Sequence, residues 1–299
     1  MYSEAYTHSD SQYQEMWDLL VKSYTLTGRM HNWTFARLEN WRYASCKKEP
    51  REYYLDKVRL WRDASGELVG FCIAEGEGDC ISMQTLPGYE EIESDMLAWV
   101  EQDWGAEKAK IEIPLYDYDE ARKALLADCG YTDAGHVMNM RTYDLSQGYS
   151  GIVLPEGFRV TTLAEYADYE ALIETERLTF NSDYLDRAWF DGKASAPSYD
   201  YGLHFIIIAP DERPAAFALG WIDAHNQAAE VDPVGTHPEF RKRGLAKAAV
   251  VACFQELAQR GARRAYIASG AEPNPSNFLY ESLQPSEKFR EHLWEKRLD

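Results

Sequence analysis

The stretch HPEFRKRGLAKAAV, residues 237–250, joins three consecutive cations to the start of a helix. Arg241, Lys242 and Arg243 precede Gly244 in a chain whose formal net charge is -19. A helix N-terminus carries unpaired backbone N–H groups and about half a positive charge. Gly244 has no Cβ, so the backbone can approach an anion closely. The stretch predicts a site for a polyanion, most simply a pyrophosphate. Taken alone, it also fits a solvated run of charge beside a helix.

The elements around this loop favour a mixed α/β structure. Buried strands are predicted over 203–210 and 215–224, and a third over 228–237 is interrupted by Pro233, which indicates a bulge. A helix is predicted over about 242–260, with two adjacent apolar rows and Gly261 as its cap. Another strand, a short helix and a final strand follow. The loop thus joins a strand to a long amphipathic helix.

The first half of the chain repeats this outline of hairpin, strand, helix, strand, helix and strand. The repetition lies in the pattern, with little residue identity, and it indicates an internal duplication. A segment rich in Gly, Ser and Pro lies near the middle of the chain. We therefore predict domains over 1–146 and 157–299, joined by a linker at about 147–156.

Length and composition limit the class of protein. The 299 residues suggest two domains, and no stretch approaches the ~18 apolar residues of a membrane span. The N-terminus lacks the basic start and apolar core of a signal peptide. An odd number of scattered cysteines fits a reducing cytoplasm; they are Cys46, Cys72, Cys80, Cys129 and Cys253. The acidic balance argues against nucleic-acid binding and suits either a cationic substrate or simple solubility.

Two motifs resemble the GNAT superfamily of acyl-CoA-dependent N-acyltransferases. EVDPVGTHPEFRKRGLAKAAV (230–250) is similar to the family's acetyl-CoA motif Q/R-x-x-G-x-G/A, and NFLYESL (277–283) to its Asn-x-x-Tyr-Glu helix. The resemblance covers about 157–297. It implies two GNAT-like domains, each a mixed, mostly antiparallel twisted sheet flanked by helices. It also implies acetyl-CoA as cosubstrate and no metal.

The resemblance assigns cofactor contacts residue by residue. Its motif begins at Arg241, and the pyrophosphate would bind the backbone of Lys242, Arg243, Gly244, Leu245, Ala246 and Lys247. The backbone of Val234 and Thr236 would pair with pantetheine, and the Val234 N–H would polarise the thioester carbonyl. Asn277 would bond pantetheine, or else serve as a cap or surface residue.

Acyl transfer to an amine also needs groups that move protons. Glu230 lies where several GNAT enzymes place a carboxylate base, and Asp232, two residues on, shares its strand face. Either could serve as the base, or both could be ordinary strand residues. Tyr280 matches the family tyrosine that protonates the CoA sulfur, although a lone tyrosine on a short helix is often a core residue.

The first half lacks this motif. Its corresponding turn, MQTLPGYEEIES (83–94), has no Arg-x-x-Gly-x-Gly/Ala and carries Glu90, Glu91 and Glu93, which would repel a pyrophosphate. We predict that this copy is degenerate, binds no CoA and helps to shape the acceptor site. An apolar row near helical spacing is predicted to pack internally, with an acceptor site as the alternative; it comprises Trp33, Phe35, Leu38 and Trp41.

The expected function is transfer of an acetyl group from acetyl-CoA to a primary amine of a small molecule or peptide. The alternatives are a non-catalytic acyl-CoA sensor and transfer of a different acyl group. No nucleic acid, membrane or metal partner is expected, and a homo-oligomer is compatible with the sequence. The expected location is cytoplasmic.

Overall fold

The chain forms two compact units whose residues interleave along the sequence. A computed structural model describes residues 1–30, 32–45, 49, 51–149 and 151–298, so Cys46 lies outside the described part. The first unit contains residues 1–42, 49–139 and 289–299, and the second contains 43–48 and 140–288. The division does not follow chain order, and two of its boundaries fall within β6 (Thr132–Asp144) and β12 (Glu287–Arg297). The assignment of a cofactor-free role to one half and a cofactor-binding role to the other remains a prediction.

The second unit is built on a mostly antiparallel run of strands that includes one parallel pair. Its strand order is β7-β8-β9-β10-β11, and only β10 and β11 run parallel. These are β7 (Arg159–Thr162), β8 (His204–Ile208), β9 (Pro214–Asp223), β10 (Ala228–Thr236) and β11 (Arg264–Gly270). Strand β6 (Thr132–Asp144) contributes its last five residues, Met140–Asp144, to this unit. The predicted strands therefore exist with small shifts at their ends.

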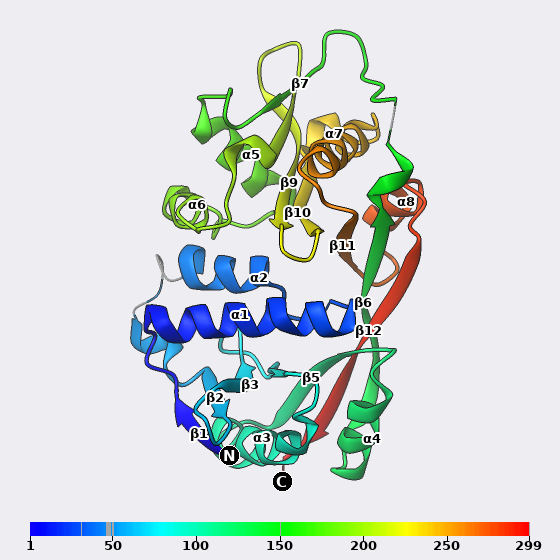
Figure 1. Cartoon of the computed structure of the whole chain (residues 1–299). Coiled ribbons are helices and arrows are strands. Elements are labelled where there is room, and N and C mark those ends of the chain that lie inside the picture. Colours follow the sequence, from blue (N-terminus) through cyan, green and yellow to red (C-terminus); the bar gives the residue numbers. More distant parts are fainter. Residues whose placement is uncertain (31, 46–48, 50, 150, 299) are drawn as a thin grey trace. The chain divides into compact units, whose positions relative to one another are not determined.

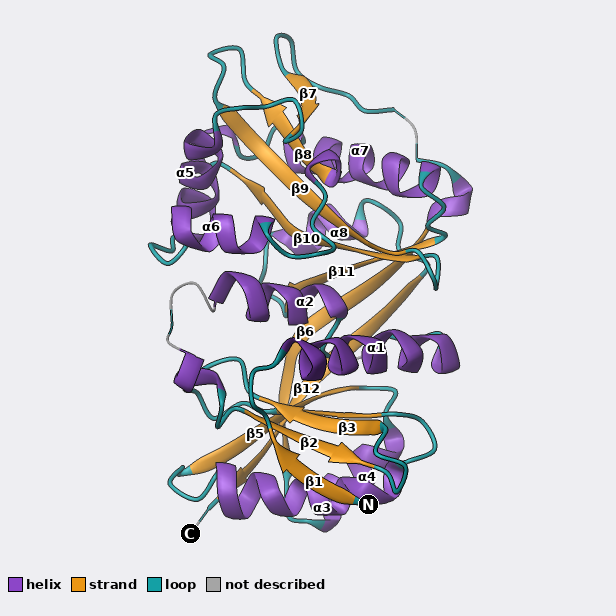
Figure 2. Ribbon diagram, turned by 60° about the vertical axis from the view of Figure 1, so that its left-hand side comes forward, coloured by secondary structure: helices purple, strands orange, loops and turns teal. Residues whose placement is uncertain are grey.

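Helices cover both faces of this sheet, as Figure 2 shows: α7 lies on one face, and α5 and α6 on the other. The helices are α5 (Tyr169–Phe180), α6 (Arg187–Ala194), α7 (Leu245–Gln259) and α8 (Ser276–Glu281). Short 3-10 turns occupy 145–147, 201–203 and 238–240. Of the two apolar rows predicted for α7, the one made of Leu245, Ala249, Cys253 and Leu257 is fully buried. The other is buried at Val250 and Phe254 and half-buried at Ala246 and Ala258.

A bulge interrupts β10, as the position of Pro233 predicts. Val231 pairs with Gly220 and Val234 with Ala218, so β10 has one more residue than β9 over this interval. The parallel pairing with β11 covers only Ala228–Glu230 of β10. The rest of β10 therefore diverges from β11 toward the start of α7.

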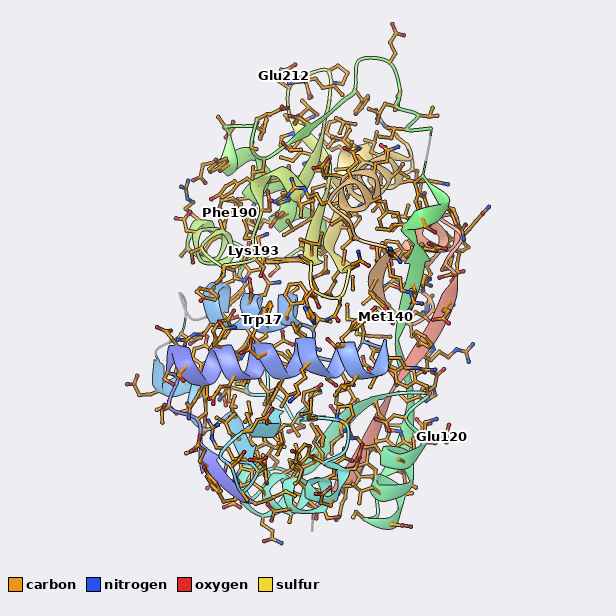
Figure 3. The ribbon with its side chains drawn as sticks, viewed as in Figure 1. Trp17, Glu120, Met140, Phe190, Lys193 and Glu212 are labelled. Atoms are coloured by element: carbon orange, nitrogen blue, oxygen red, sulfur yellow. The ribbon has the colours of Figure 1, made fainter. Side chains whose placement is uncertain are left out.

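A charged network lies buried in the second unit. The Lys193 ammonium lies 3.1 and 3.2 Å from the two Glu176 oxygens, and both side chains are almost fully buried. His204 approaches the same carboxylate at 3.6 Å, and Tyr199 bonds its Nδ1 at 2.8 Å. Figure 3 marks Lys193 on α6. Burial, and then the charge of Lys193, lower the pKa of His204 well below its usual range.

The first unit has a second sheet of order β1-β2-β3-β4, all antiparallel. These four strands are β1 (Tyr2–Ala5), β2 (Val58–Arg62), β3 (Leu68–Ile73) and β4 (Ser82–Thr85). The first unit also contains β5 (Lys110–Tyr116) and β12 (Glu287–Arg297) from Phe289 onward, which are not part of this sheet. Its helices are α1 (Asp10–Thr27), α2 (Phe35–Glu39), α3 (Glu93–Trp99) and α4 (Glu120–Asp128). Residues 40–44 and 100–104 continue α2 and α3 as π-turns, and 3-10 turns occupy 51–54 and 90–92.

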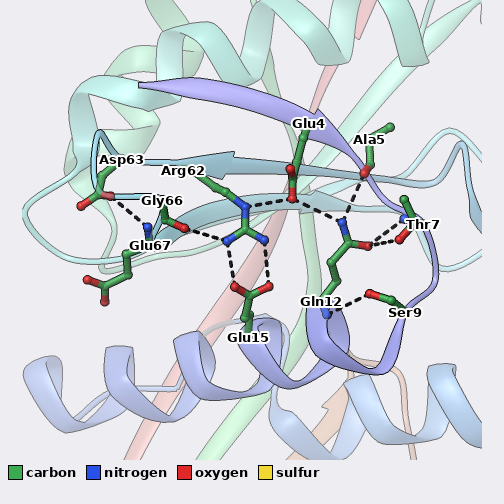
Figure 4. A network of polar contacts seen from close by, with 10 residues as sticks. All are labelled: Glu4, Ala5, Thr7, Ser9, Gln12, Glu15, Arg62, Asp63, Gly66 and Glu67. Atoms are coloured by element: carbon green, nitrogen blue, oxygen red, sulfur yellow. Dashed lines mark hydrogen bonds and ion pairs between the residues drawn. The ribbon is translucent and has the colours of Figure 1, made fainter.

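The buried guanidinium of Arg62 joins helix α1 to the sheet β1-β2-β3-β4, as Figure 4 shows. Arg62 donates to both oxygens of Glu15 on α1 at 2.8 Å and to Glu4 on β1 at 2.8 Å. A bidentate pair of this kind fixes direction as well as distance. Ser9 caps α1 by accepting from the backbone N–H of Gln12.

The last strand of the chain belongs to the first unit. Strand β12 pairs antiparallel with β5 from Glu291–Tyr116 to Arg297–Lys110, and Figure 1 shows this red strand beside β5. Phe289–Asp299 therefore groups with residues almost 180 positions away, although the sequence pattern placed it with the second half. Trp33, Phe35, Leu38 and Trp41 are all buried, in accord with their expected packing role.

Candidate functional site

A groove of about 660 Å³ opens at the junction of β10 and α7 in the second unit. Its wall comes from the end of β10, the basic loop, the start of α7 and the loop and helix at 274–280. All seven loop residues predicted to contact the cofactor line it, with Val234, Thr236 and Tyr280. The structure thus brings together, within one unit, residues that are up to 46 positions apart in the sequence.

The basic loop presents its backbone at the mouth of this groove. Gly244 is the N-cap of α7 in the left-handed conformation, with φ at 78°, and no side chain caps the helix. A Cβ added to Gly244 would meet nothing within 4 Å, so the space beside the loop is open. The first N–H groups of α7 have no acceptor within the helix. They and the helix dipole therefore remain available to an anion in the groove.

Side chains of the loop also hold it in place. Arg241 donates through Nε to the carbonyl of Thr236 at 3.3 Å and through Nη2 to that of Thr179 at 3.1 Å. Lys247 donates to the carbonyl of Ser282 at 3.1 Å. Lys242 and Arg243 are exposed beside the groove. The cations therefore divide between shaping the loop and lending it positive charge.

The open edge of β10 faces away from β9. His237 donates its N–H to the Ala215 carbonyl at 2.9 Å, which makes this a hydrogen-bonded pair. In an antiparallel ladder such pairs alternate, so Val234 and Thr236 occupy the positions between them. Their backbone groups consequently point to the side where β11 has diverged. An extended ligand in the groove could pair with this edge.

Tyr280 is 5% exposed and lines the groove from α8. Burial raises the pKa of its phenol, the charge of Asp232 raises it further, and Arg141 opposes this change. The phenol is therefore protonated at neutral pH and can donate a proton.

The two candidate bases lie in different surroundings on β10. Glu230 is 8% exposed and pairs with Trp221 on one side and Tyr266 on the other. Asp232 is exposed, and its carbonyl accepts from the indole N–H of Trp221 at 2.7 Å. Because the bulge begins just after Val231, the regular alternation that groups the two carboxylates ends there.

Asn277 is engaged inside the protein. Its Oδ1 accepts from Arg141 at 2.8 Å and from Ser269 at 2.7 Å, and its Nδ2 donates to the Gly270 carbonyl at 3.2 Å. The sequence had offered it as a pantetheine contact. Arg141 itself was overlooked in the sequence, where an arginine within the strand pattern HVMNMRTYDLS is the only signal.

No group of three or more His, Cys, Asp or Glu side chains suited to a metal occurs among the residues with described positions. Within the same residues, no helix is both long and apolar enough to cross a membrane. The groove itself is lined by backbone amides, cations and a phenol, and the two candidate bases Glu230 and Asp232 are not among its lining residues.

Comparison with known proteins agrees with this geometry. Residues 169–284 match the sequence profile of the Acetyltransferase (GNAT) family. No curated protein sequence matches the chain. Among solved structures, a tandem GNAT protein from the clavulanic acid biosynthesis pathway is similar, with a TM-score of 0.70 and 14% identity over 99% of this chain and 98% of that one.

Two further structures support the same fold. A GCN5-related N-acetyltransferase from Sphaerobacter thermophilus has a TM-score of 0.65 at 17% identity, covering 99% of this chain and 95% of its own. A GNAT-family acetyltransferase from Colwellia psychrerythraea has a TM-score of 0.62 at 10% identity, covering 99% and 100%. These likenesses extend over both halves and confirm the predicted tandem α/β fold.

Proposed function

We propose, from the match of residues 169–284 to the acetyltransferase (GNAT) family, that the chain is an acyltransferase which transfers an acetyl group from acetyl-CoA to a primary amine. The acceptor is a small molecule or a peptide. The observation that supports this most is the groove lined by residues 241–247, the open edge of β10 and the Tyr280 phenol. These three features suit a pyrophosphate, an extended amide chain and a departing sulfur, in that order.

The proposed reaction is direct attack. The amine nitrogen forms a bond to the thioester carbonyl carbon, and the bond from that carbon to sulfur breaks. The proton lost by the amine goes to Glu230 or Asp232, directly or through water, and the leaving thiolate takes the phenol proton of Tyr280. The N–H of Val234 would stabilise the negative charge that develops on the carbonyl oxygen.

The cysteines have no part in this proposal. Cys253 is fully buried, and burial raises the pKa of its thiol, so a reactive thiolate is disfavoured. Cys72 is also buried with a raised pKa. We propose a cytoplasmic location, because an odd number of scattered cysteines fits a reducing compartment.

The role of the first unit follows from the same proposal. We propose that it binds no CoA. The acidic balance of the chain, with a net charge of -19, would raise the local concentration of a cationic amine. An assembly of several copies is compatible with this function.

The decisive experiment compares wild type with Tyr280→Phe in a thiol-release assay with acetyl-CoA and a panel of amines. Loss of the general acid should lower kcat by roughly 100-fold, while acetyl-CoA binding stays close to wild type. Tyr184→Phe is the matched control, since Tyr184 is 40% exposed and lies outside the groove lining.

Two outcomes would favour the alternatives. Tight CoA binding with no turnover for any amine would indicate a sensor. Faster turnover with succinyl-CoA or a longer acyl-CoA, measured by mass spectrometry of the products, would indicate a different acyl donor.

A further inference from the structure

Arg141 is a fully buried arginine that is not itself among the residues lining the groove. It lies on the part of β6 that belongs to the second unit. Its guanidinium donates to Glu281 at 2.9 Å, Ser269 at 2.8 Å and Asn277 at 2.8 Å. Burial of an arginine is costly unless its donors are satisfied, and here three acceptors from two elements meet it.

The acceptors enclose the position of Tyr280. Asn277 and Glu281 lie on α8 on either side of Tyr280, and the guanidinium carbon lies 5.8 Å from the centroid of the Tyr280 ring. Tyr143, two residues after Arg141 on β6, donates its hydroxyl to the Tyr280 carbonyl at 3.0 Å. Both the side chains and the backbone of α8 are thus held from β6.

Helix α8 needs such anchors. It has six residues, and the side chain of Asn274 accepts from the N–H of its first residue, Ser276, at 3.0 Å. An isolated helix of this length is unstable in water, so tertiary contacts must set its position and rotation. The rigid guanidinium fork fixes direction better than a lysine ammonium, which is a point charge on a flexible stem.

We propose that Arg141 is a positioning residue that sets the place of the Tyr280 phenol in the groove by clamping α8 at Asn277 and Glu281. This inference rests on the proposed function and extends it to a residue outside the groove. Asn277 then acts as part of the clamp, and its amide is not needed by the cosubstrate.

The test is a double-mutant cycle between Arg141→Met and Tyr280→Phe. Arg141→Met should lower kcat by roughly 10- to 100-fold, with the KM for acetyl-CoA within about threefold of wild type. In the Tyr280→Phe background the same change should have little further effect, because the phenol it positions is gone. Arg141→Lys should recover part of kcat.

A purely structural role would give a different pattern. It would lower kcat by the same factor in both backgrounds and would raise KM as well, and either result overturns the proposal. If Arg141→Met does not fold, Glu281→Gln removes one anchor from a half-exposed side chain and should show the same non-additivity to a smaller degree. Arg159→Met is the matched control, because Arg159 pairs with Glu212 in an exposed position and lies on the edge strand β7, which β8, β9 and β10 separate from β11 in the strand order.

Hydrogen exchange separates failure of this inference from failure of the proposed function. Arg141→Met should speed exchange in the peptide covering α8 and leave α7 unchanged. Unchanged exchange in α8 overturns the clamp whether or not the enzyme turns over. A wild type that releases no thiol while exchange responds as expected would reject acetyl transfer and keep the clamp.

Discussion

The turn from β4 into α3 and the turn from β10 into α7 are the corresponding strand-to-helix turns of the two units. They differ in which group contacts their backbone amides. In the first unit the N–H of Gly88 donates to both carboxylate oxygens of Glu90, at 3.0 and 3.1 Å. In the second unit the helix begins at Gly244 with no side-chain cap and with a groove beside it. The first turn binds a carboxylate of its own, whereas the second lies beside the groove, where we propose that its amides bind the pyrophosphate.

The strands before these turns also differ, in whether a side chain joins the strand to its parallel neighbour beyond their pairing. Strand β4 leads from a parallel bridge to β5 at Cys80–Glu112, as β10 does with β11. Beyond that bridge the buried Asn32 amide donates to the Pro114 carbonyl of β5 at 2.7 Å and accepts from Gln84 of β4 at 3.4 Å. In the first unit the Asn32 side chain thus occupies the space between β4 and β5. The corresponding space between β10 and β11 in the second unit stays open. This supports the proposal that only one copy binds CoA.

The largest expected effect concerns the two turn glycines. Gly244→Asp should weaken CoA binding by about 100-fold, or about 2.7 kcal/mol, because it puts a carboxylate beside the pyrophosphate site. Gly88→Asp is the matched control, since Gly88 also has a positive φ and nothing within 4 Å of a Cβ. Calorimetric titration with CoA measures both. Weakening by Gly88→Asp alone would assign the site to the other unit.

A second effect separates the units by pH. His204 has a folded-state pKa well below its unfolded value, so its stabilising contribution is full above about pH 6.5 and falls as the pH drops below that. The slope is at most about 1.4 kcal/mol per pH unit. Hydrogen exchange at pH 7.5 and 5.5 should show β8 and β9 losing protection faster than β2 and β3. His204→Gln should reduce this difference, and an unchanged difference would contradict the role of His204.

The smallest effect tests the self-bound carboxylate. Glu90→Gln removes a charge-assisted contact at an exposed turn and should lower the free energy of unfolding by about 0.5–1 kcal/mol. CoA stoichiometry should stay at one per chain, because Asn32 still joins β4 and β5. A second bound CoA in the titration would break the comparison between the turns. Glu91→Gln, at the neighbouring position, serves as control.

Most of the candidate site was predictable because its signals are local. The cations of 241–243, the small residues Gly244 and Ala246 and the apolar rows of α7 lie within one turn and one helix. Pro233 predicted the bulge, since proline cannot complete a ladder. What the pattern could not supply was the partner of each buried polar group. Asn277 is the example: its residue type suits a ligand contact, but its amide bonds Arg141.

The sequence by itself determined the kinds of elements, their order and the basic helix entry, because periodicity, turn residues and charge act over a few positions. The tertiary structure alone decided that β12 closes the first unit, that Arg141 reaches Asn277 across 136 positions and that Asn32 bridges to Pro114 across 82. Such contacts depend on strand order and on which buried donor needs an acceptor. Neither can be predicted from the residues that are neighbours in the sequence.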